Sequence, residues 1–542
     1  MKLLASLLLL SSLCFGQTAP RDTVDMIVYN ANIVSGPFTP TYKAMVVKDG
    51  KIVALYKKNK WEKKYWSATT LDMQKKVVMP GFIDAHCHFL GLGKAMNEVN
   101  LYGAKSWNET VERVVAFAKL HPEKKWIQGR GWDQNNWAVK DFPDNKLLDS
   151  LLQNKYVVLN RVDGHAVIAN TNVLMLAKVT KDSEIAGGKV LLNQGNLTGV
   201  LIDKATELVE SVIPNPGQQD KINWLLMAQK ECLSYGITQV ADAGLPIQDI
   251  LLIDSLCQAG VLKMRYYLMA NPGAETRDYF NKNGVLSTDN VKCKSIKIYS
   301  DGALGSRGAL LKHPYCDDKT NYGLSLIDPV SLDSLLAYIY AKGLQANTHC
   351  IGDSANAMVL KAYAKALKTT TNDRRWRIEH AQVVAPEDLT YFQIYSIIPS
   401  VQPTHATSDM YWAETRLCSS RMPGAYSYQS LLANSGYILL GTDFPVEYVS
   451  PFYTIRSARF RQDAKAFPVG GFNKKEALTA QQTFAGMSIW AATGNFWERQ
   501  TGTLEIGKFA DFMVLGKNPY TASFKDLSGM KVDNVFIGGK EH

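Results

Sequence analysis

The stretch VMPGFIDAHCH, from Val78 to His88, begins as an apolar run, passes through a Pro-Gly pair and ends in two histidines separated by one residue. A short apolar run bounded by turn residues predicts a buried β-strand. Side chains two residues apart on a strand point to the same face, so His86 and His88 can bind one metal ion while Cys87 points away. The pair alone is a weak signal, and its position at the end of a predicted strand gives it weight.

Seven further short apolar runs follow, and stretches with helical periodicity lie between them, as in SLDSLLAYIYAKG (331–343). Eight strands that alternate with helices predict an α/β protein built on a (β/α)8 TIM-like barrel, whose active site lies at the carboxyl ends of the strands. The further predicted strands are GITQVADAG (236–244), KMRYYLMA (263–270), KSIKIYSDG (294–302), LQANTHC (344–350), WRIEHAQ (376–382), SIIPSVQP (396–403) and YILLGTDFP (437–445).

The two ends of the chain carry strand patterns of another kind. VVKDGKIVAL (46–55) places apolar runs around Asp-Gly, which is a strong hairpin signal, and ADFMVL (510–515) and VDNVFIGGK (532–540) are also strand-like. The first crossover is too long for one helix and predicts a barrel helix plus an inserted subdomain or lid. We therefore expect a small β-sandwich made from residues 17–77 and 496–542, and a barrel in residues 78–495 with an insertion at about 89–235.

The composition is that of a globular protein with a sizeable core. The 542 residues include 46% hydrophobic and 20% charged residues, and the formal net charge is +10. The lysines are scattered and the sequence contains no nucleic-acid recognition motif, so we expect no nucleic-acid partner. Of the eight cysteines, removal of Cys14 leaves seven, and an odd number spread over a large chain without a CxxC pair is not a disulfide framework. We expect most of them to be buried as small hydrophobic side chains.

Residues 1–16 have the pattern of a secretory signal peptide. A lysine precedes an apolar run from Leu3 to Leu13, and cleavage is expected after Gly16. Attachment of lipid to Cys14 is the less favoured interpretation, because Leu13 is a poor residue before a lipidated cysteine. The sequence has no run long and apolar enough to cross a bilayer. We expect an exported protein, periplasmic or secreted, without an integral membrane segment.

Four more polar side chains end or interrupt predicted barrel strands. His349 and His380 end the fifth and sixth strands, and their joint position favours ligands over hydrogen-bonded core histidines. Asp443 ends the eighth strand, where a metal ion or a proton-transfer role would compensate its burial, a helix N-cap being the alternative. Lys297 lies in the fourth strand, where burial would lower the pKa of its amine and permit carbamate formation with carbon dioxide. Alternatively, Lys297 faces outward or pairs with Asp301.

In chain order this set of residues resembles the metal-dependent amidohydrolase superfamily. The segments IKIYSDGALGSRGAL, ANTHCIGD, RIEHAQ, SVQPTHATSD and LLGTDFPV are more narrowly similar to the branch that contains N-substituted formamide deformylase. The resemblance implies a site for two divalent ions, with Zn²⁺ favoured and Mn, Fe, Co and Ni as alternatives. The implied ligands are His86, His88 and Asp443 for the first ion, His349 and His380 for the second, and carboxylated Lys297 as a bridge.

The resemblance also implies catalytic roles. Asp443 would move a proton from the attacking water to the leaving nitrogen. His165, in DGHAVIAN, is similar to a histidine of this branch that would donate to the developing oxyanion, and a structural role in the loop is the alternative. His405 follows the seventh strand and is expected beside the metal ligands rather than among them.

Four residues are expected to contact the substrate. Trp132 and Asp133 belong to the insertion and would line the pocket, unless Trp132 packs the insertion onto the barrel. Asp301 and Arg307 follow the fourth strand and therefore lie at the barrel mouth. Arg307 would clamp a substrate carboxylate or, alternatively, form a surface ion pair.

These features predict an exported metal-dependent hydrolase that cleaves a C–N bond of an amide-like or formamide-like small molecule. Two alternatives stay open. One is other amidohydrolase chemistry, such as hydrolysis of a cyclic amide, carbamate or ester, or an isomerisation. The other is a catalytically silent ligand-binding protein, against which the presence of all six ligand residues weighs. Assembly into a homodimer also stays open.

Overall fold

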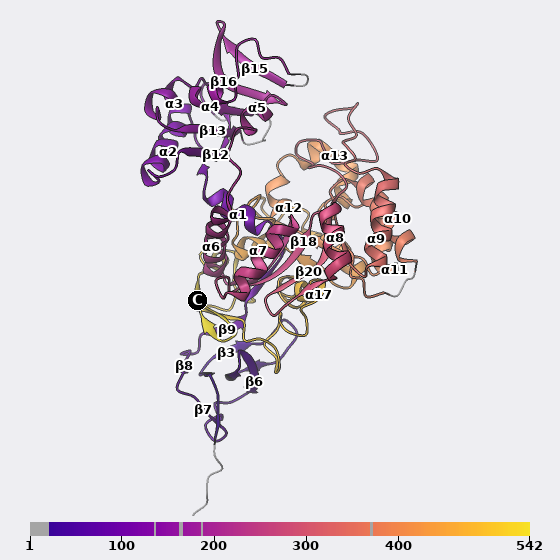
Figure 1. The fold of residues 1–542 in the computed structure, drawn as a ribbon. Coiled ribbons are helices and arrows are strands. Elements are labelled where there is room, and N and C mark those ends of the chain that lie inside the picture. The colour runs from indigo at the N-terminus through magenta and orange to yellow at the C-terminus, as the bar shows by residue number, and fades with distance from the viewer. Residues whose placement is uncertain (1–20, 135–136, 162–165, 186–187, 369–371) are drawn as a thin grey trace, which may run out of the picture.

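The computed structural model describes residues 21–542 apart from 135–136, 162–165, 186–187 and 369–371. The expected signal peptide, residues 1–16, lies outside the described residues. A central barrel carries the insertion at one end and a β-sandwich at the other (Figure 1). Within the described ranges, no helix has both the length and the apolar character needed to cross a membrane.

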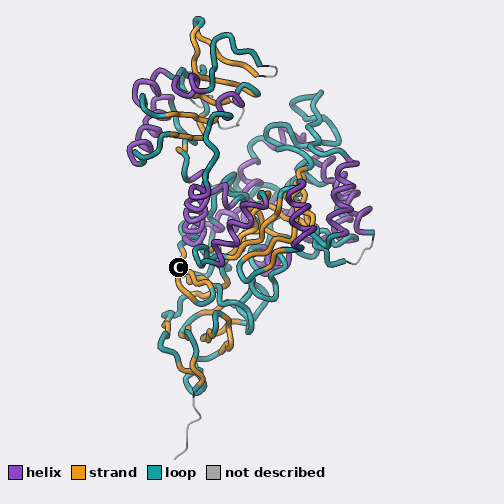
Figure 2. The backbone as a smooth tube through the Cα atoms, viewed as in Figure 1, coloured by secondary structure: helices purple, strands orange, loops and turns teal. Residues whose placement is uncertain are grey.

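Eight parallel strands form the barrel sheet in the order β10-β17-β18-β20-β21-β22-β23-β24. This order confirms the predicted TIM-like barrel, and helices surround the strands (Figure 2). The barrel strands are β10 (Phe82–Cys87), β17 (Ile237–Leu245), β18 (Arg265–Ala270), β20 (Val291–Tyr299), β21 (Gln345–Cys350), β22 (Arg377–His380), β23 (Ile398–Val401) and β24 (Leu439–Leu440), and the short β19 (Leu286–Ser287) pairs with β20.

The helices outside the insertion contribute buried or partly buried apolar residues to the largest hydrophobic core, which also includes residues of the barrel strands. They are α1 (Phe89–Met96), α6 (Gln218–Ser234), α7 (Ile247–Gln258), α8 (Ala274–Asn283), α9 (Pro329–Ala341), α10 (Asp353–Leu367), α11 (Thr390–Ile394), α12 (Pro403–Asp409), α13 (Ala413–Arg421), α14 (Tyr428–Ser435), α15 (Pro451–Phe460), α16 (Ala480–Gly486), α17 (Ile489–Gly494) and α18 (Phe524–Ser528).

The first and last barrel strands meet through a buried carboxylate. Thr442 donates its backbone N–H and its hydroxyl to Asp84, at 3.1 and 2.7 Å, and the N–H of Asp443 donates to the carbonyl of His86 at 2.8 Å. Gly441 permits this approach, because a Cβ there would lie 2.6 Å from the backbone nitrogen of His86. The contact places Asp443 beside the end of β10.

Both chain ends build the β-sandwich, as the indigo and yellow strands in Figure 1 show. Its first sheet has the order β6-β5-β2-β8 and its second β27-β26-β25-β9-β3-β4. The strands are β2 (Met26–Tyr29), β3 (Asn32–Val34), β4 (Thr41–Tyr42), β5 (Ala44–Lys48), β6 (Lys51–Tyr56), β8 (Thr70–Asp72), β9 (Val77–Pro80), β25 (Phe512–Leu515), β26 (Val532–Ile537) and β27 (Lys540–Glu541), while β1 (Asp22–Thr23) pairs with β7 (Tyr65–Trp66).

The predicted first strand, 78–88, is two strands in the structure. β9 pairs with β25 and β3 in the sandwich, whereas β10 pairs with β17 in the barrel. The chain changes sheet at Gly81 rather than between residues 77 and 78. Both strands are fully buried, so the burial pattern does not mark where the chain changes sheet.

The insertion has its own sheet and cores. The sheet order is β11-β12-β13-β14-β16-β15, and the flanking α1 and α6 pack together against the barrel, so the separate subdomain is shorter than 89–235. Its elements are β11 (Val99–Asn100), α2 (Trp107–Leu120), β12 (Trp126–Trp132), α3 (Lys146–Leu151), β13 (Tyr156–Arg161), β14 (Ala166–Ala169), α4 (Thr171–Leu176), β15 (Gly188–Asn193), β16 (Asn196–Asp203) and α5 (Thr206–Glu210).

A buried ion pair joins the barrel to the sandwich. Arg265 of β18 donates to Asp511, which precedes β25, with Nε–Oδ2 and Nη2–Oδ1 distances of 2.5 and 2.9 Å. Both side chains are almost completely buried. Removal of one partner from such a pair leaves an uncompensated charge in a medium of low polarity.

We therefore expect Asp511→Ala to lower the free energy of unfolding by about 3–5 kcal/mol, because Arg265 stays buried without its partner. Urea denaturation followed by circular dichroism measures the change. The matched control is Asp533→Ala, which removes the exposed partner of Lys76 and should cost less than about 1 kcal/mol. Equal effects of the two variants would contradict the assignment.

Candidate metal centre

The end of β10 places two imidazoles at the carboxyl edge of the barrel. His86 is fully buried, and the ring of His88, which is about one-third exposed, lies 5.9 Å from it between centroids. Cys87 faces the opposite side, where its thiol contacts the carbonyl of Ala241. The alternation expected from the His-x-His pattern is therefore present.

Glu379 fixes the orientation of His86. Its carboxylate lies 2.5 Å from Nδ1 of His86 and is held by Nη2 of Arg377 at 3.0 Å. Burial and then the nearby Lys297 lower the pKa of His86 to about 4, despite the opposing effect of Glu379. The ring is thus neutral near pH 7, with a proton on Nδ1 and the lone pair of Nε2 directed into the site.

Lys297 of β20 points into the barrel. Its Nζ lies 3.3 Å from Nε2 of His86, and the residue is 1% exposed. Burial lowers the pKa of Lys297 to about 8, so a substantial part of the amine is neutral at mildly alkaline pH. The alternatives of an outward-facing lysine or a pair with Asp301 do not fit this position.

His349 and His380 end β21 and β22 and lie side by side, with 4.5 Å between ring centroids. Nδ1 of His380 lies 2.7 Å from the side-chain oxygen of Gln402, which leaves its Nε2 free to accept. Burial, and then the charge of Lys297, lower the pKa of His349 to about 3. Burial likewise holds the pKa of His380 well below its usual range. Both rings are therefore neutral donors of a lone pair.

Asp443 lies between these histidines. Its Oδ1 is 3.1 Å from Nε2 of His88 and 3.7 Å from Nε2 of His86, while its Oδ2 is 3.7 Å from Nε2 of His405. Burial alone would raise the pKa of Asp443, but the hydrogen bond from His88 and the surrounding imidazoles outweigh it and hold that pKa well below the usual range. The carboxylate is thus ionised and faces ligands on both sides.

The donor atoms converge in two groups that share Asp443. In each group the ligand atoms all lie within 4.8 Å of one another, and the groups are His86, His88, Asp443 and His380, His405, Asp443. The Nε2 atoms of His349 and His405 are buried and make no hydrogen bond within the described residues. Imidazole nitrogens, two of them without a hydrogen-bond partner, and a carboxylate form a donor set that fits a divalent ion.

The structure does not place Trp132 at a substrate surface. Its ring is fully buried in the core of the insertion and its indole N–H donates to the carbonyl of Leu159. The expectation that Trp132 lines the pocket is therefore wrong, because the ring stabilises the insertion itself. Asp133 pairs with Arg161 at 2.8 Å within the insertion. His165 lies outside the described residues.

Asp301 and Arg307 also have partners within the chain. Asp301 is 1% exposed, and its carboxylate accepts backbone N–H groups of Leu310, Ile351 and Gly352 at 2.8–3.0 Å. It therefore holds the loop after β20 to the end of β21 rather than meeting solvent at the mouth. Arg307 pairs with Asp317 through two hydrogen bonds of 2.9 and 3.2 Å, which is the surface ion pair rather than the carboxylate clamp.

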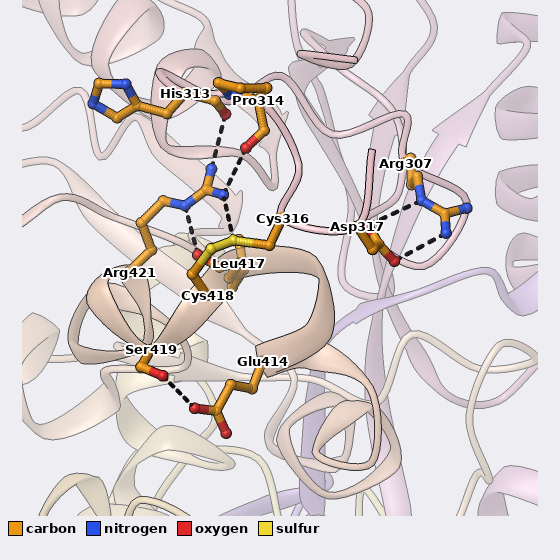
Figure 3. Close-up of a disulfide and its surroundings, with 10 residues drawn as sticks. All are labelled: Arg307, His313, Pro314, Cys316, Asp317, Glu414, Leu417, Cys418, Ser419 and Arg421. Carbon is orange, nitrogen blue, oxygen red and sulfur yellow. Dashed lines mark hydrogen bonds and ion pairs between the residues drawn. A yellow bond between two sulfur atoms is a disulfide. The ribbon is translucent and has the colours of Figure 1, made fainter. Parts of the chain in front are cut away.

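A disulfide bond between Cys316 and Cys418 joins the loop after β20 to α13 (Figure 3). Arg421 reinforces the junction, because it donates to the carbonyls of His313 and Pro314 at 2.9 and 2.8 Å. Cysteine counting alone gave no sign of this bond. The expectation of buried cysteines is confirmed for five described residues, which are Cys87, Cys232, Cys257, Cys293 and Cys350.

Sequence reasoning also missed Glu379 and Arg377. Both belong to β22 and are fully buried, although charged side chains rarely lie inside a barrel unless they are paired. The signal was present in RIEH, where Arg377 and Glu379 are two residues apart and share a face. Strict alternation would turn His380 away from that face, but its backbone has a positive φ of 73°, and its ring lies 4.8 Å from that of His86 between centroids.

We expect Glu379→Gln to weaken metal binding about 10- to 100-fold, because the partner that orients His86 loses its charge. Titration of the metal-free protein against a chromophoric chelator measures the affinity. Glu498→Gln, which alters the carboxylate paired with Arg375 away from the site, is the control and should leave it unchanged. Unchanged affinity in Glu379→Gln would refute the orienting role.

Reduction of the Cys316–Cys418 bond should lower the free energy of unfolding by about 2–5 kcal/mol, because the bond closes a long loop in the unfolded chain. The two cysteines are 102 residues apart. Thermal unfolding with and without a dithiol reductant measures the effect. The double variant Cys316→Ser/Cys418→Ser should unfold at the same temperature as the reduced wild type, and the reductant should not change that temperature. A wild-type unfolding temperature that is also unchanged by the reductant would contradict the prediction.

Known proteins match this chain over nearly its whole length. It is 30% identical over 97% of its length to Protein LONG AFTER FAR-RED 3 of Arabidopsis thaliana, of which 92% is covered. It is 24% identical over 87% of its length to N-substituted formamide deformylase of Arthrobacter pascens, of which 89% is covered. A crystal structure of an uncharacterised metal-dependent hydrolase from Pyrococcus furiosus has the same fold, with a TM-score of 0.77, 24% identity, and coverage of 92% of this chain and all of that one.

The family model described as "Amidohydrolase family" matches residues 69–541. The match includes the whole barrel and the histidine and aspartate groups that fit a divalent ion. It confirms the resemblance inferred from the sequence. The chain therefore belongs to the amidohydrolase family and is a hydrolase whose site supports the use of divalent metal.

Proposed function

We propose that this protein is an exported metal-dependent hydrolase that cleaves the C–N bond of a small amide-like or formamide-like molecule. The observation that carries the proposal is the convergence of His86, His88 and Asp443 on one point, beside a buried lysine, Lys297. The similarity to N-substituted formamide deformylase supports a C–N bond as the target. The position of the site at the carboxyl ends of the barrel strands agrees with where barrel enzymes bind substrate.

The residues present fit a pair of divalent ions, for which Zn²⁺ suits the nitrogen and oxygen donors best. His86, His88 and Asp443 would hold the first ion, and His349 and His380 the second. Lys297, once carboxylated, would bridge them. The pKa of about 8 favours that modification, because only the neutral amine reacts with carbon dioxide.

Bound divalent ions supply Lewis acidity, which promotes the attack of water on a carbonyl carbon. The protein residues then manage protons and orientation. Asp443, ionised and in contact with both sides of the site, accepts a proton from the attacking water and delivers it to the nitrogen of the departing amine. Glu379 holds the ring of His86 in one tautomer throughout.

Two features support export. The sequence of residues 1–16 has the pattern of a signal peptide, and the Cys316–Cys418 bond is typical of an oxidising compartment. Expression of the full chain followed by cell fractionation and determination of the mature N-terminus tests this part. Recovery of the protein in the cytoplasm with Met1 intact would refute it.

Asp443→Asn should abolish hydrolysis while at least one ion stays bound, because the amide cannot accept the proton. The assay is a panel of N-formyl amines, N-acyl amino acids, lactams, carbamates and esters, with metal content measured on the same samples. Asp533→Asn, at an exposed ion pair, is the control and should keep full activity. Normal turnover in Asp443→Asn would rule out the proton-transfer role, and a wild type active only on another bond type would rule out the C–N assignment.

Lys297→Ala should lose activity, and short carboxylates added to the buffer should restore part of it by replacing the missing bridge. The matched control is Lys292→Ala, which alters a lysine of the same strand whose amine contacts Phe496 and Gln500 instead of the site. Metal content measured beside turnover completes the test. A Lys297→Ala protein that binds two ions as tightly as the parent would exclude the bridging role.

A further inference from the structure

His405 stands at the first turn of α12, directly after β23. Pro403 begins this helix, and the imidazole of His405 lies close to the carboxylate of Asp443, which follows β24. Its ring lies nearly parallel to that of His380, with 5.9 Å between centroids and 19° between planes. Two imidazoles from neighbouring segments of the barrel therefore lie side by side above the same space.

The Nε2 atom of His405 is buried without a hydrogen-bond partner among the described residues. The facing oxygen, Oδ2 of Asp443, is 3.7 Å away, which is beyond hydrogen-bond distance. Leaving a buried polar nitrogen unpaired is energetically unfavourable. A buried nitrogen of this kind, directed at an ionised carboxylate, calls for a ligand between the two groups.

Asp443 presents one oxygen to each histidine group. Its Oδ1 faces His86 and His88, while its Oδ2 faces His405. The donor atoms of His380, His405 and Asp443 all lie within 4.8 Å of one another. Ligands of one zinc ion sit at about 2.0–2.2 Å from it, so small side-chain adjustments bring these three atoms to a common ion.

His349, which the family resemblance pairs with His380, belongs to neither convergent group. Its Nε2 lies 3.7 Å from Oδ1 of the buried Asp301. In the group that does contain His380, the other donors lie on the side of β23 and β24. His405 lies on that side.

We propose that His405 is a further ligand of the second ion, which it holds together with His380 and Oδ2 of Asp443. This inference rests on the proposed function and adds a residue from the seventh strand's loop to the metal centre. Asp443 would then be shared by the two ligand groups.

The test compares three variants in metal-binding titrations that do not depend on activity. His405→Phe keeps a flat ring beside His380 and removes the donor nitrogen, whereas His405→Asp keeps a donor atom. His313→Phe, at an exposed histidine outside the site, is the control. Metal-free protein is titrated with Zn²⁺ by calorimetry and with Co²⁺ by visible absorption, and apo-protein unfolding is recorded for each variant.

The wild type and His313→Phe should bind two equivalents. In His405→Phe the second equivalent should bind at least about tenfold more weakly and the cobalt spectrum of that site should change, while the first equivalent stays. His405→Asp should recover the second equivalent. Should His405→Phe fail to fold, His405→Gln takes its place in the same comparison.

Two equivalents bound by His405→Phe with unchanged affinity and spectrum would overturn the inference, and so would a wild type that binds fewer than two ions. The proposed function fails separately. A wild type that binds two ions but cleaves no member of the amide panel would refute the C–N hydrolase and leave the role of His405 intact.

Discussion

The bond between Asp84 and Thr442 closes the barrel, and the site depends on that closure. The last strand, β24, is only two residues long, so it can form few backbone hydrogen bonds with the rest of the sheet. Asp84 adds two further hydrogen bonds, which it accepts from the backbone N–H and the hydroxyl of Thr442. Burial raises the pKa of this carboxyl to about 7, in spite of the hydrogen bonds it accepts. The barrel is therefore closed by a carboxyl group whose burial is energetically unfavourable. Its hydrogen bonds make neighbours of two residues that are 358 positions apart in the chain.

A second layer of charge lies beneath the metal-binding face. Arg377 donates to Glu379, to the carbonyl of Ala85 and to Ser400, and Glu379 in turn fixes His86. The arginine ties the first, sixth and seventh strands together with polar bonds inside the barrel. Because these charged groups are buried and bonded to one another, they hold the imidazole of His86 in one orientation.

The sequence was sufficient for the barrel and for most of the site because both follow short-range patterns. Apolar runs of strand length recur eight times, and His86, His349, His380 and Asp443 each stand where such a run ends. The misassigned residues depend on partners far away in the chain. Trp132 is an aromatic near a polar loop in sequence, yet Leu159 and the insertion core decide its burial. Arg307 finds Asp317, and Cys316 finds Cys418, through loop paths that no local pattern encodes.

The covalent link across the barrel mouth also changes what cleavage of the backbone would do. Residues 317–417 lie between the bonded cysteines, and this stretch carries three barrel strands, each of which ends in or leads to a histidine of the candidate metal centre. A protease that cuts one exposed loop there produces two fragments that remain attached. Such a nicked molecule migrates as one species on a gel run without reductant and keeps the side chains of the candidate metal centre on a single covalent framework.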